Sequence, residues 1–373
     1  MNIILAGGGT GGHVYPALAI AEALRRRDPA ARTLFIGSRG GMEATLVPSA
    51  GIPFVGLPMS PPRSRAPLRV LRSLAGAGAS LGQATVVLAR FRPDAIIATG
   101  GIAAVPSVMV AAALRMPILV LEGNAVPGRA NRFLARFSRA VAVSSEEAGA
   151  SLPGGRIVVT GLPVRREVYS ATREEGLRSF GLDPARRTVL VIGGSQGAAR
   201  LNAAVADAVA HLSGRLDVQV IHQAGRGWDG ALPDGPVPQR LERIAYVRVP
   251  YLERIGEAYA CADLVVSRCG ANALAEITAC GLPAILVPYP HAADDHQARN
   301  AAALVAAGAA VLLPDAALNG DALAGQIAAL LDDPERLQAM ALAARRWGRR
   351  DAADRVLALL ASFAQAAPTK ACG

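Results

Sequence analysis

A histidine ends a glycine-rich segment near the start of the chain, Gly8-Gly9-Thr10-Gly11-Gly12-His13. Glycine lets a backbone bend sharply and approach a ligand closely, so the segment predicts a tight turn between a strand and a helix. The first turn of that helix would present N–H groups and partial positive charge to an anion. The imidazole of His13 could take a proton from an attacking hydroxyl, bind a substrate oxygen, or only cap the turn.

A second glycine-rich segment, Gly193-Gly194-Ser195-Gln196-Gly197, repeats the pattern in the second half of the chain. Both segments read G-G-[TS]-x-G between an apolar run and a helical stretch, and Thr99-Gly100-Gly101 is a weaker copy. One such turn is compatible with a plain strand-to-helix connection. Two matched turns favour two similar domains whose strand ends could face one cleft.

The segment from Ser267 to Glu276 also combines an apolar strand, a glycine turn at Gly270 and the start of a helix. The carboxylate of Glu276 would lie about two turns along and could accept both hydroxyls of a ribose. The alternatives are a solvated helix glutamate or an ion pair with Arg268.

Two histidines and two aspartates lie within Pro288–Asn300. Their spacing is not H-E-x-x-H and no further ligand cluster is near in sequence, so the segment predicts no metal site. A polar loop that caps a helix, with Asp294 or Asp295 near its start, is the simpler interpretation. The amide of Gln297 can donate and accept, which suits sugar hydroxyls.

The elements that must position these residues alternate as in β-α-β units. The expected strands are Ile3–Ala6, Thr33–Ile36, Phe54–Leu57, Ala95–Ala98, Ile118–Leu121, Ala140–Val143, and then Val189–Ile192, Val218–His222, Leu264–Ser267 and Ala284–Val287. A hinge is expected between residues 161 and 187. A dinucleotide oxidoreductase is disfavoured because the second strand ends Phe35-Ile36-Gly37-Ser38-Arg39 without a ribose-binding carboxylate, although Arg39 leaves an NADP form open.

The length of 373 residues and the 52% of apolar residues suit two domains with sizeable cores. None of the four cysteines forms a C-x-x-C pair, which fits free thiols in a reducing cytoplasm. The N-terminus lacks the basic and apolar regions of a signal peptide. The uncharged stretch from Ala95 to Leu114 is interrupted by Gly100, Gly101 and Pro106, so it predicts a strand, a turn and a helix rather than a membrane span.

The positive charge is confined to the first half of the chain. Up to Arg165 there are 18 Lys and Arg against 7 Asp and Glu, whereas the remainder has 21 against 22. A Pro-rich loop at Pro58–Pro67 precedes an expected helix in which leucines, including Leu81, alternate with Arg69 and Arg72, and Arg63, Arg65, Arg90 and Arg92 flank it. This pattern fits an anionic lipid interface or an ordinary helix with a basic face. Nucleic acid is disfavoured because few aromatic residues lie among the arginines.

Three motifs in order, G-G-T-G-G-H, G-G-S-Q-G-A and G-L-P-A-I-L-V-P-Y-P…D-D-H-Q…N-A, resemble one family over nearly the whole chain. It is the UDP-N-acetylglucosamine:undecaprenyl-pyrophosphoryl-muramoyl-pentapeptide N-acetylglucosaminyltransferases. The resemblance implies an α/β GT-B fold, in which two Rossmann-like parallel-sheet domains face each other across a cleft. It implies an acceptor domain over residues 1–164, a UDP-sugar domain over 165–338, and a C-terminal helix and tail over 339–373 that pack back on the first domain.

The resemblance also implies donor-binding residues, with no cofactor and no metal. By motif match they are Thr10, Gly11, Gly12, Asn124, Arg165, Ser195, Leu252, Ala271, Asn272, Ala273, Leu274, Ala275, Glu276 and Gln297. Leu252 would offer backbone groups to uracil and Glu276 would hold the ribose. Ser195 and Arg165 would serve the diphosphate, and Asn124 and Gln297 the sugar.

This chain departs from the family at two positions. Gly123 stands where a glutamine is usual, and Ala273 stands where the family has a hydroxyl residue close to the phosphates. Backbone N–H groups could still bind the phosphates there. The departures affect individual donor contacts more than the reaction.

The implied reaction is an inverting displacement, in which the 4-hydroxyl of the lipid-linked N-acetylmuramoyl-pentapeptide attacks the anomeric carbon and UDP leaves. The transition state would resemble an oxocarbenium ion, and helix N-termini and Arg165 would stabilise the leaving diphosphate. His13 is the first choice for the base and Glu122 the second. The enzyme would be peripheral, at the cytoplasmic face of the cell membrane, with UDP-N-acetylglucosamine, the undecaprenyl-linked acceptor and an anionic membrane surface as partners.

Three other functions stay open at this stage. A UDP-N-acetylglucosamine 2-epimerase shares the two-domain plan but needs no lipid acceptor. Another GT-B sugar-to-lipid transferase would use a different acceptor. A nucleotide-binding protein without catalysis would bind the donor and transfer nothing.

Overall fold

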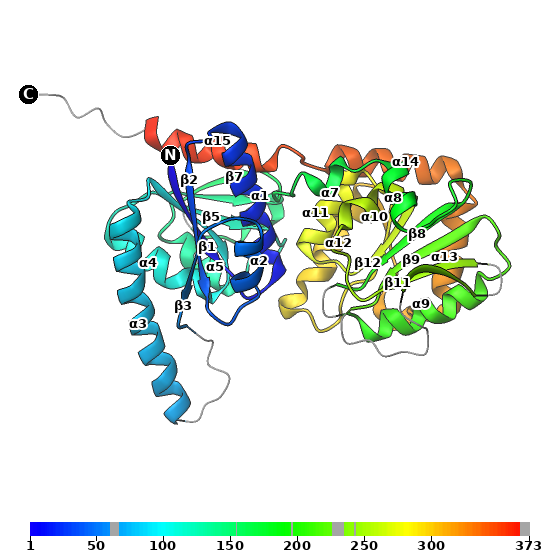
Figure 1. The fold of residues 1–373 in the computed structure, drawn as a ribbon, viewed down its shortest axis with the longest axis horizontal. Helices are drawn as coiled ribbons and strands as arrows, with labels where there is room; N and C mark the ends of the chain where they lie inside the picture. Colours follow the sequence, from blue (N-terminus) through cyan, green and yellow to red (C-terminus); the bar gives the residue numbers. More distant parts are fainter. Residues whose placement is uncertain (60–66, 154, 195–196, 226–234, 242–243, 366–373) are drawn as a thin grey trace, which may run out of the picture. The chain divides into compact units, whose positions relative to one another are not determined.

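The computed structural model describes residues 1–59, 67–153, 155–194, 197–225, 235–241 and 244–365. The chain divides into two compact units: unit 1 is Met1–Arg165 with Arg349–Gly373, and unit 2 is Arg166–Gly348 (Figure 1). The sequence-based boundaries were residues 164 and 338. The second division lies later because helix α14 (Pro334–Trp347) packs against α11 (Ala271–Cys280) and α13 (Gly320–Leu331) of unit 2.

Unit 1 is built on a seven-stranded parallel sheet with the order β3-β2-β1-β4-β5-β6-β7. The strands are β1 (Asn2–Gly7), β2 (Arg32–Ser38), β3 (Phe54–Leu57), β4 (Ala95–Gly100), β5 (Ile118–Glu122), β6 (Ala140–Val143) and β7 (Arg156–Val159). The helices are α1 (Gly11–Arg27), α2 (Glu43–Ser49), α3 (Pro67–Phe91), η1 (Ile102–Ala104), α4 (Val105–Ala113), α5 (Arg129–Ala135), α6 (Glu146–Ala150) and α15 (Ala352–Gln365).

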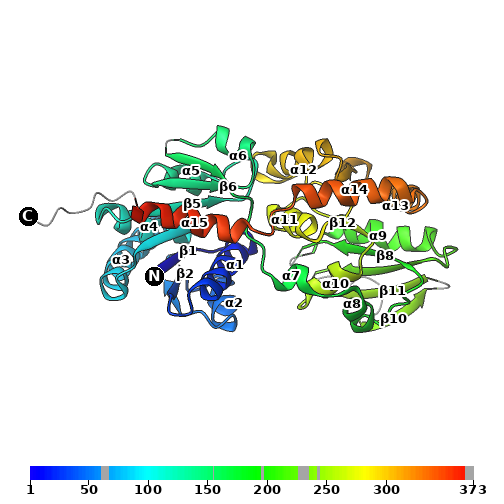
Figure 2. The ribbon, with the colours of Figure 1, turned by 90° about the horizontal axis from the view of Figure 1, so that it is seen from above.

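Helices cover this sheet because its strands are apolar toward both faces, as parallel strands require. One core cluster joins the strands to α3, α4, α5 and α6 through side chains such as Leu88, Val108 and Leu134. The C-terminal helix α15 packs alongside α1, as both ribbon views show (Figures 1 and 2). The chain therefore returns to unit 1 at its end.

Unit 2 has a seven-stranded sheet with the order β10-β11-β9-β8-β12-β13-β14, in which only β10 is antiparallel to its neighbour. The strands are β8 (Arg187–Ile192), β9 (Val218–Gln223), β10 (Gly235–Leu241), β11 (Ile244–Val249), β12 (Leu264–Ser267), β13 (Ala284–Leu286) and β14 (Ala310–Leu312). The remaining helices are α7 (Glu167–Ser170), α8 (Arg173–Ser179), α9 (Ala199–His211), α10 (Ile255–Cys261), η2 (Ala293–Asp295), α12 (His296–Ala306) and η3 (Asp315–Ala317).

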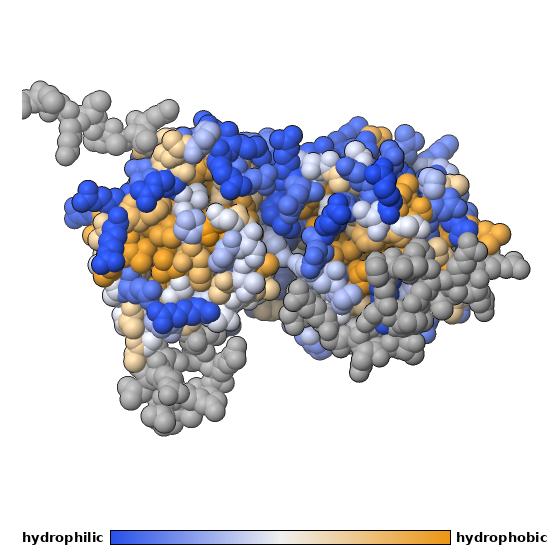
Figure 3. Space-filling view, viewed as in Figure 1, coloured by the Kyte–Doolittle hydropathy of each residue, from blue (hydrophilic) through white to orange (hydrophobic). Residues whose placement is uncertain are grey.

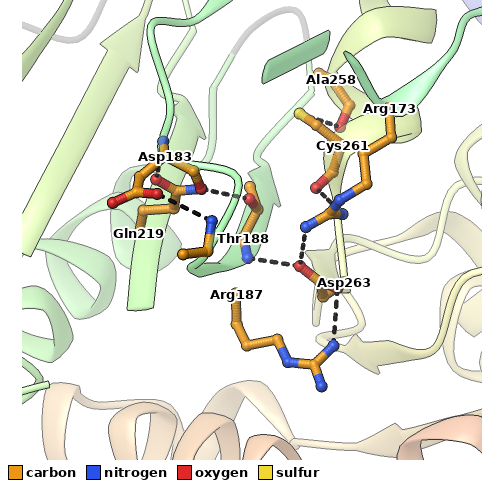
Figure 4. A network of polar contacts seen from close by, with 9 residues as sticks. Arg173, Asp183, Arg187, Thr188, Gln219, Ala258, Cys261 and Asp263 are labelled. Atoms are coloured by element: carbon orange, nitrogen blue, oxygen red, sulfur yellow. Dashed lines mark hydrogen bonds and ion pairs between the residues drawn. The ribbon is translucent and has the colours of Figure 1, made fainter. Parts of the chain in front are cut away.

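The segment expected to be a hinge is tied to the amino-terminal edge of the unit 2 sheet (Figure 4). Asp263 accepts hydrogen bonds from the Thr188 N–H at 2.8 Å and from the guanidinium groups of Arg173 at 3.1 Å and Arg187 at 3.2 Å. Gln219 donates to the Asp183 carbonyl and accepts from the Asp183 N–H. These contacts hold residues from 173 onward as part of unit 2.

The α/β fold with two Rossmann-like parallel sheets is confirmed, and all ten expected strands are present within one or two residues. The uncharged stretch after Ala95 forms β4, η1 and α4, as predicted. Among the described residues, four strands were not anticipated: β7, β10, β11 and β14. β7 is an edge strand that is mostly exposed, although its sequence R-I-V-V is a local strand signal, and β14 has only three residues.

In the described part of the chain, no helix is long and apolar enough to cross a bilayer.

Candidate functional site

The first glycine-rich turn connects β1 to α1 in unit 1. Gly8 and Gly9 have φ of 148° and 86°, which residues with a side chain rarely adopt. Thr10 is the N-cap with an extended backbone, and its side chain makes no cap hydrogen bond. The helix begins at Gly11, so Thr10, Gly11 and Gly12 lie together at the start of α1, as expected from the sequence.

His13 lies in the first turn of α1 and folds back over this loop. Its Nδ1 is 2.9 Å from the Gly8 carbonyl oxygen and 3.3 Å from Thr10 Oγ1. A carbonyl oxygen can only accept, so this contact assigns the proton to Nδ1. Nε2 then carries the lone pair, which is the form a general base needs.

The turn at Gly100 and Gly101 packs directly against His13, which explains the weaker copy of the motif. Both residues have positive φ, 115° and 80°. A β-carbon at Gly100 would lie 2.7 Å from His13 Cδ2, and one at Gly101 would overlap the Gly8 carbonyl oxygen. Glycine is therefore needed here for close packing of two turns.

Glu122, at the end of β5, is 3% exposed and accepts four hydrogen bonds. The donors are the Asn124 N–H at 2.9 Å, Asn124 Nδ2 at 3.2 Å, the Gly128 N–H at 3.0 Å and Asn131 Nδ2 at 2.9 Å. Both carboxylate oxygens thus organise the loop between β5 and α5. Asn124 lies in this loop, and Gly123 is part of it.

Asn131 was not singled out from the sequence. Its Nδ2 also donates to the Leu121 carbonyl at 3.0 Å, and it lies 3.2 Å from where a β-carbon of Gly100 would be. It therefore links the loop of Glu122 to the turn beside His13. A lone asparagine in a helix has no local pattern that could have revealed this contact.

Arg165 is assigned to unit 1, where its guanidinium carbon lies 4.5 Å from the centre of the Tyr15 ring. Tyr15 also lies 3.0 Å from where a β-carbon of Gly11 would be. The structure thus places Arg165 within reach of the residues at the start of α1. The sequence had grouped it with the donor domain.

The second glycine-rich turn connects β8 to α9 in unit 2. Gly194 and Gly197 have φ of 87° and 74°, and a β-carbon at Gly197 would overlap the Ala224 carbonyl oxygen. Ser195 lies outside the described residues. The turn is the counterpart of the first one, as the sequence predicted.

A buried network not recognised from the sequence supports this second turn. Asn202 Nδ2 donates to the Ala224 carbonyl at 2.7 Å, His222 Nε2 lies 3.1 Å from Asn202 Oδ1, and His222 Nδ1 lies 2.7 Å from the Tyr246 hydroxyl. Because the Asn202 amide nitrogen donates to Ala224, its oxygen must accept from His222 Nε2–H. Burial, with a smaller effect of Arg248, lowers the pKa of His222 to about 3, so the ring is neutral.

Helix α11 follows β12 through Gly270, and its first residues Ala271 to Ala275 carry no charge. Glu276 Oε2 accepts a hydrogen bond from the Tyr259 hydroxyl at 3.2 Å. Burial, followed by the charge of Glu276, raises the pKa of Tyr259 well above its ordinary value, so the hydroxyl stays a donor. This bond orients the Glu276 carboxylate.

Arg268 pairs with Asp315, not with Glu276, which corrects one alternative from the sequence. Its Nη1 lies 2.6 Å from Asp315 Oδ1 and also donates to the carbonyls of Val287 and Pro288. The guanidinium lies 5.7 Å from the centre of the Tyr289 ring. Arg268 therefore holds the loop after β13, and the Tyr259 hydroxyl contacts Glu276.

Gln297, in the first turn of α12, has a fixed orientation. Its Oε1 accepts from the backbone N–H groups of Cys269 and Tyr289, each at 3.0 Å. Two N–H donors require the oxygen on that side, so the amide NH₂ points away from them as a donor. Asn300 Nδ2 donates to the Cys269 carbonyl at 3.0 Å and fixes the same turn.

The aspartates expected to cap α12, and Leu252, expected to contact uracil, lie in unit 2. Asp295 occupies the N-cap position of α12, but its side chain makes no cap hydrogen bond, and Asp294 and Asp295 both have φ of 52°. Leu252 follows β11 and is buried, at 5% exposure. Among the described residues, no group of three His, Cys, Asp or Glu is arranged to hold a metal ion.

Burial raises the pKa of the Cys269 thiol, beside the α11 turn, to about 12. A thiol that stays protonated is a poor nucleophile. Cys269 is therefore not a candidate nucleophile at this turn.

Comparisons with known proteins agree with this geometry. Residues 3–143 match the glycosyltransferase family 28 N-terminal domain, and residues 188–356 match the glycosyltransferase family 28 C-terminal domain. A protein of Desulfitobacterium hafniense (strain Y51), named UDP-N-acetylglucosamine--N-acetylmuramyl-(pentapeptide) pyrophosphoryl-undecaprenol N-acetylglucosamine transferase, is 42% identical over 96% of this chain and 98% of its own length. A protein of Halothermothrix orenii with the same name is 39% identical over 98% of this chain and its full length.

Solved structures are similar over nearly the whole chain. A crystal structure titled Acinetobacter baumannii MurG has a TM-score of 0.74 and 27% identity, and covers 97% of this chain and 99% of its own. A putative UDP-N-acetylglucosamine 2-epimerase from Listeria monocytogenes has a TM-score of 0.70 at 15% identity, over 98% of this chain and 97% of its own. At that identity the second similarity is one of fold alone.

Proposed function

The chain belongs to glycosyltransferase family 28, and we propose that it transfers N-acetylglucosamine from UDP-N-acetylglucosamine to lipid-linked N-acetylmuramoyl-pentapeptide. Relatives at about 40% identity over nearly their full length carry the name of this transferase. The product is the lipid-linked disaccharide precursor of peptidoglycan. The observation that carries the proposal is the pair of glycine turns, one at the carboxyl end of β1 and one at that of β8, each followed by a helix.

We assign donor binding mainly to unit 2. The carboxylate of Glu276, oriented by Tyr259, would accept the ribose hydroxyls. The amide NH₂ of Gln297 would donate to sugar hydroxyls, because its oxygen already accepts two backbone N–H groups. The start of α11 would bind phosphate through backbone amides, which need no side chain at Ala273. Ser195 and the backbone of Leu252 remain proposed donor contacts.

His13 is the proposed general base. With Nδ1 held by the Gly8 carbonyl, Nε2 would take the proton as the acceptor 4-hydroxyl attacks the anomeric carbon. The bond from that carbon to the UDP oxygen breaks, and the leaving diphosphate gains negative charge. Arg165 and the amides at helix starts would stabilise that charge.

Glu122 suits a positioning role better than that of the base. Its two oxygens accept four hydrogen bonds within the loop that carries Asn124. Proton removal from a substrate would compete with these bonds. The same loop is where Asn124 would meet the sugar.

We also propose that unit 1 binds the cytoplasmic face of an anionic membrane. Leu81 and Val86 of α3 are 41% and 49% exposed, and Arg90 and Arg92 follow them on the surface. Apolar residues gather on the surface of this unit beside α3 and α4 (Figure 3). Exposed leucine and valine with nearby arginines suit a lipid interface, where each basic residue adds about 1 kcal/mol. The segment 60–66, with Arg63 and Arg65, lies outside the described residues.

The decisive experiment incubates the purified chain with UDP-N-acetylglucosamine and the lipid-linked muramoyl-pentapeptide. The expected product is the disaccharide lipid, with release of UDP. A parallel reaction without acceptor tests the epimerase, because only an epimerase would form UDP-N-acetylmannosamine. Donor binding without any transfer to lipid would refute the transferase.

A further inference from the structure

A single peptide group, the one between Gly8 and Gly9, is hydrogen-bonded on both sides by ionisable side chains. The Gly9 N–H donates to Glu43 Oε2 at 3.0 Å, and the Gly8 carbonyl of the same peptide accepts from His13 Nδ1 at 2.9 Å. Glu43, the first residue of α2, is fully buried. One planar amide therefore connects a buried carboxylate to the imidazole of the proposed base.

The surrounding glycines make room for this carboxylate. A β-carbon at Gly8 would overlap Glu43 Oε1, one at Gly41 would overlap the Glu43 carboxyl group, and one at Gly37 would lie 2.7 Å from Glu43 Cγ. Gly8 thus serves two needs, a φ of 148° and space for the carboxylate. The other oxygen of Glu43 accepts from the Ser38 N–H at 2.9 Å, so both carboxylate oxygens are fixed.

The chemical effect follows from how hydrogen bonds in a chain polarise one another. A carboxylate on an amide N–H increases the negative charge on the carbonyl oxygen of that amide. A more negative Gly8 oxygen is a better acceptor for His13 Nδ1–H. This favours the tautomer with a free lone pair on Nε2 and stabilises the imidazolium formed when Nε2 takes a proton. In serine proteases a carboxylate does this by direct contact with the histidine.

We infer that Glu43 is a positioning residue for the transfer reaction, which fixes the tautomer and orientation of His13 through the Gly8–Gly9 peptide. This inference rests on the proposed function of His13 as the base. A purely structural Glu43 would hold the turn and the β2–α2 connection equally well, so the test must separate the two roles.

The first arm of the test is kinetic. Glu43→Gln keeps the size of the side chain, but its NH₂ faces a backbone N–H that needs an acceptor. We expect kcat for transfer to fall about 10- to 100-fold, the usual effect of removing a group that orients a reactive ligand. The KM for the donor should change little, because the lost effect belongs to the transition state. Glu22→Gln is the matched control on α1, where Glu22 forms a half-exposed ion pair with Arg26, and its kinetics should equal those of the wild type.

The second arm is a double-mutant cycle. If Glu43 acts through His13, Glu43→Gln should cause no further loss of kcat in a His13→Ala background. Equal fold losses in both backgrounds would overturn the inference and leave a structural role. Wild-type kcat in a folded Glu43→Gln protein would overturn it as well.

The third arm needs no substrate. Long-range ¹H–¹⁵N spectra of the labelled wild-type protein should show His13 with its proton on Nδ1, with the resonance assigned by its loss in His13→Ala. A folded Glu43→Gln protein should show a measurable population with the proton on Nε2. A wild-type His13 with its proton on Nε2 would refute the inference. If the wild type transfers no sugar, the proposed function fails, and this arm still decides whether Glu43 fixes the tautomer of His13.

Discussion

The buried histidine of unit 2 should make this unit sensitive to mild acid. His222 is 1% exposed, and its two ring nitrogens are used by Asn202 and Tyr246. Burial lowers its pKa from an ordinary 6.5 to about 3. The unfolded chain therefore binds a proton at His222 below about pH 6.5, whereas the folded protein does not until about pH 3. The contribution of His222 to the free energy of unfolding is complete above pH 6.5, and it is lost as the pH falls toward 3.

The magnitude follows from the shift. Each pH unit in this window removes about 1.4 kcal/mol from the free energy of unfolding. Between pH 6.5 and about pH 4.5 the loss is roughly 2.7 kcal/mol, and over the whole window it is about 5 kcal/mol. The lowered pKa values of the Asp217 and Glu175 carboxyls act in the same direction, but only below the ordinary values of 3.8 and 4.5. The interval from pH 6.5 to about 4.5 therefore isolates His222.

Denaturant unfolding followed by tryptophan fluorescence suits this test, because Trp347 ends α14 of unit 2 and the other tryptophan, Trp228, also falls in the sequence range 166–348. His222→Gln can donate to Asn202 and accept from Tyr246 but does not titrate. We expect its unfolding free energy to depend less on pH than that of the wild type, by about 1.4 kcal/mol per pH unit. His211→Gln, an exposed histidine at the end of α9, should keep the wild-type slope.

Parallel pH dependences for the wild type and His222→Gln would refute this reasoning. They would mean that the network opens to water, or that His222 is protonated in the folded state, so that its burial has no cost in acid. A variant that is less stable at every pH but has the wild-type slope would contradict the reasoning in the same way.

Three other predictions concern ligands and membranes. Glu276→Ala should raise the donor KM about 10- to 100-fold, because bonds to a charged group contribute about 1.5–3 kcal/mol; unchanged donor KM in initial-rate kinetics would remove Glu276 from the ribose site. Gln297→Glu keeps the oxygen that accepts the Cys269 and Tyr289 amides but loses the NH₂ donor. Donor affinity measured by calorimetry should therefore fall about tenfold, while thermal stability stays close to that of the wild type. Leu81→Ser with Val86→Ser should lower binding to anionic vesicles about tenfold or more in flotation assays; Leu312→Ser, a 44% exposed leucine of unit 2, is the control and should bind like the wild type.

The arrangement of strands and glycine turns could be predicted from the sequence because its signals are local. Alternating apolar runs and helical stretches give the β-α-β order, and glycines between them mark the turns. The same local signals placed His13 at the start of α1 and Glu276 in α11. Two short strands were missed: β7 has four residues, with the apolar run Ile157-Val158-Val159, and β14 has three.

The residues that hold the candidate site in place were decided by the tertiary structure. Glu43 meets the Gly9 amide across 34 residues of sequence, and Arg268 meets Asp315 across 47. Glu276 is close to Arg268 in the sequence, which made it a candidate ion-pair partner. In the folded protein, packing brings the Tyr259 hydroxyl to Glu276 instead.

Where the backbone turns and which apolar faces are buried follow from local patterns, because glycine geometry and side-chain periodicity act between neighbours in the chain. Which buried polar groups meet depends on the folded arrangement, as with Glu43 and the Gly8–Gly9 peptide or His222 and Tyr246. A buried polar atom must find a partner, and the partner it finds depends on which distant segments the sheet and helices bring together.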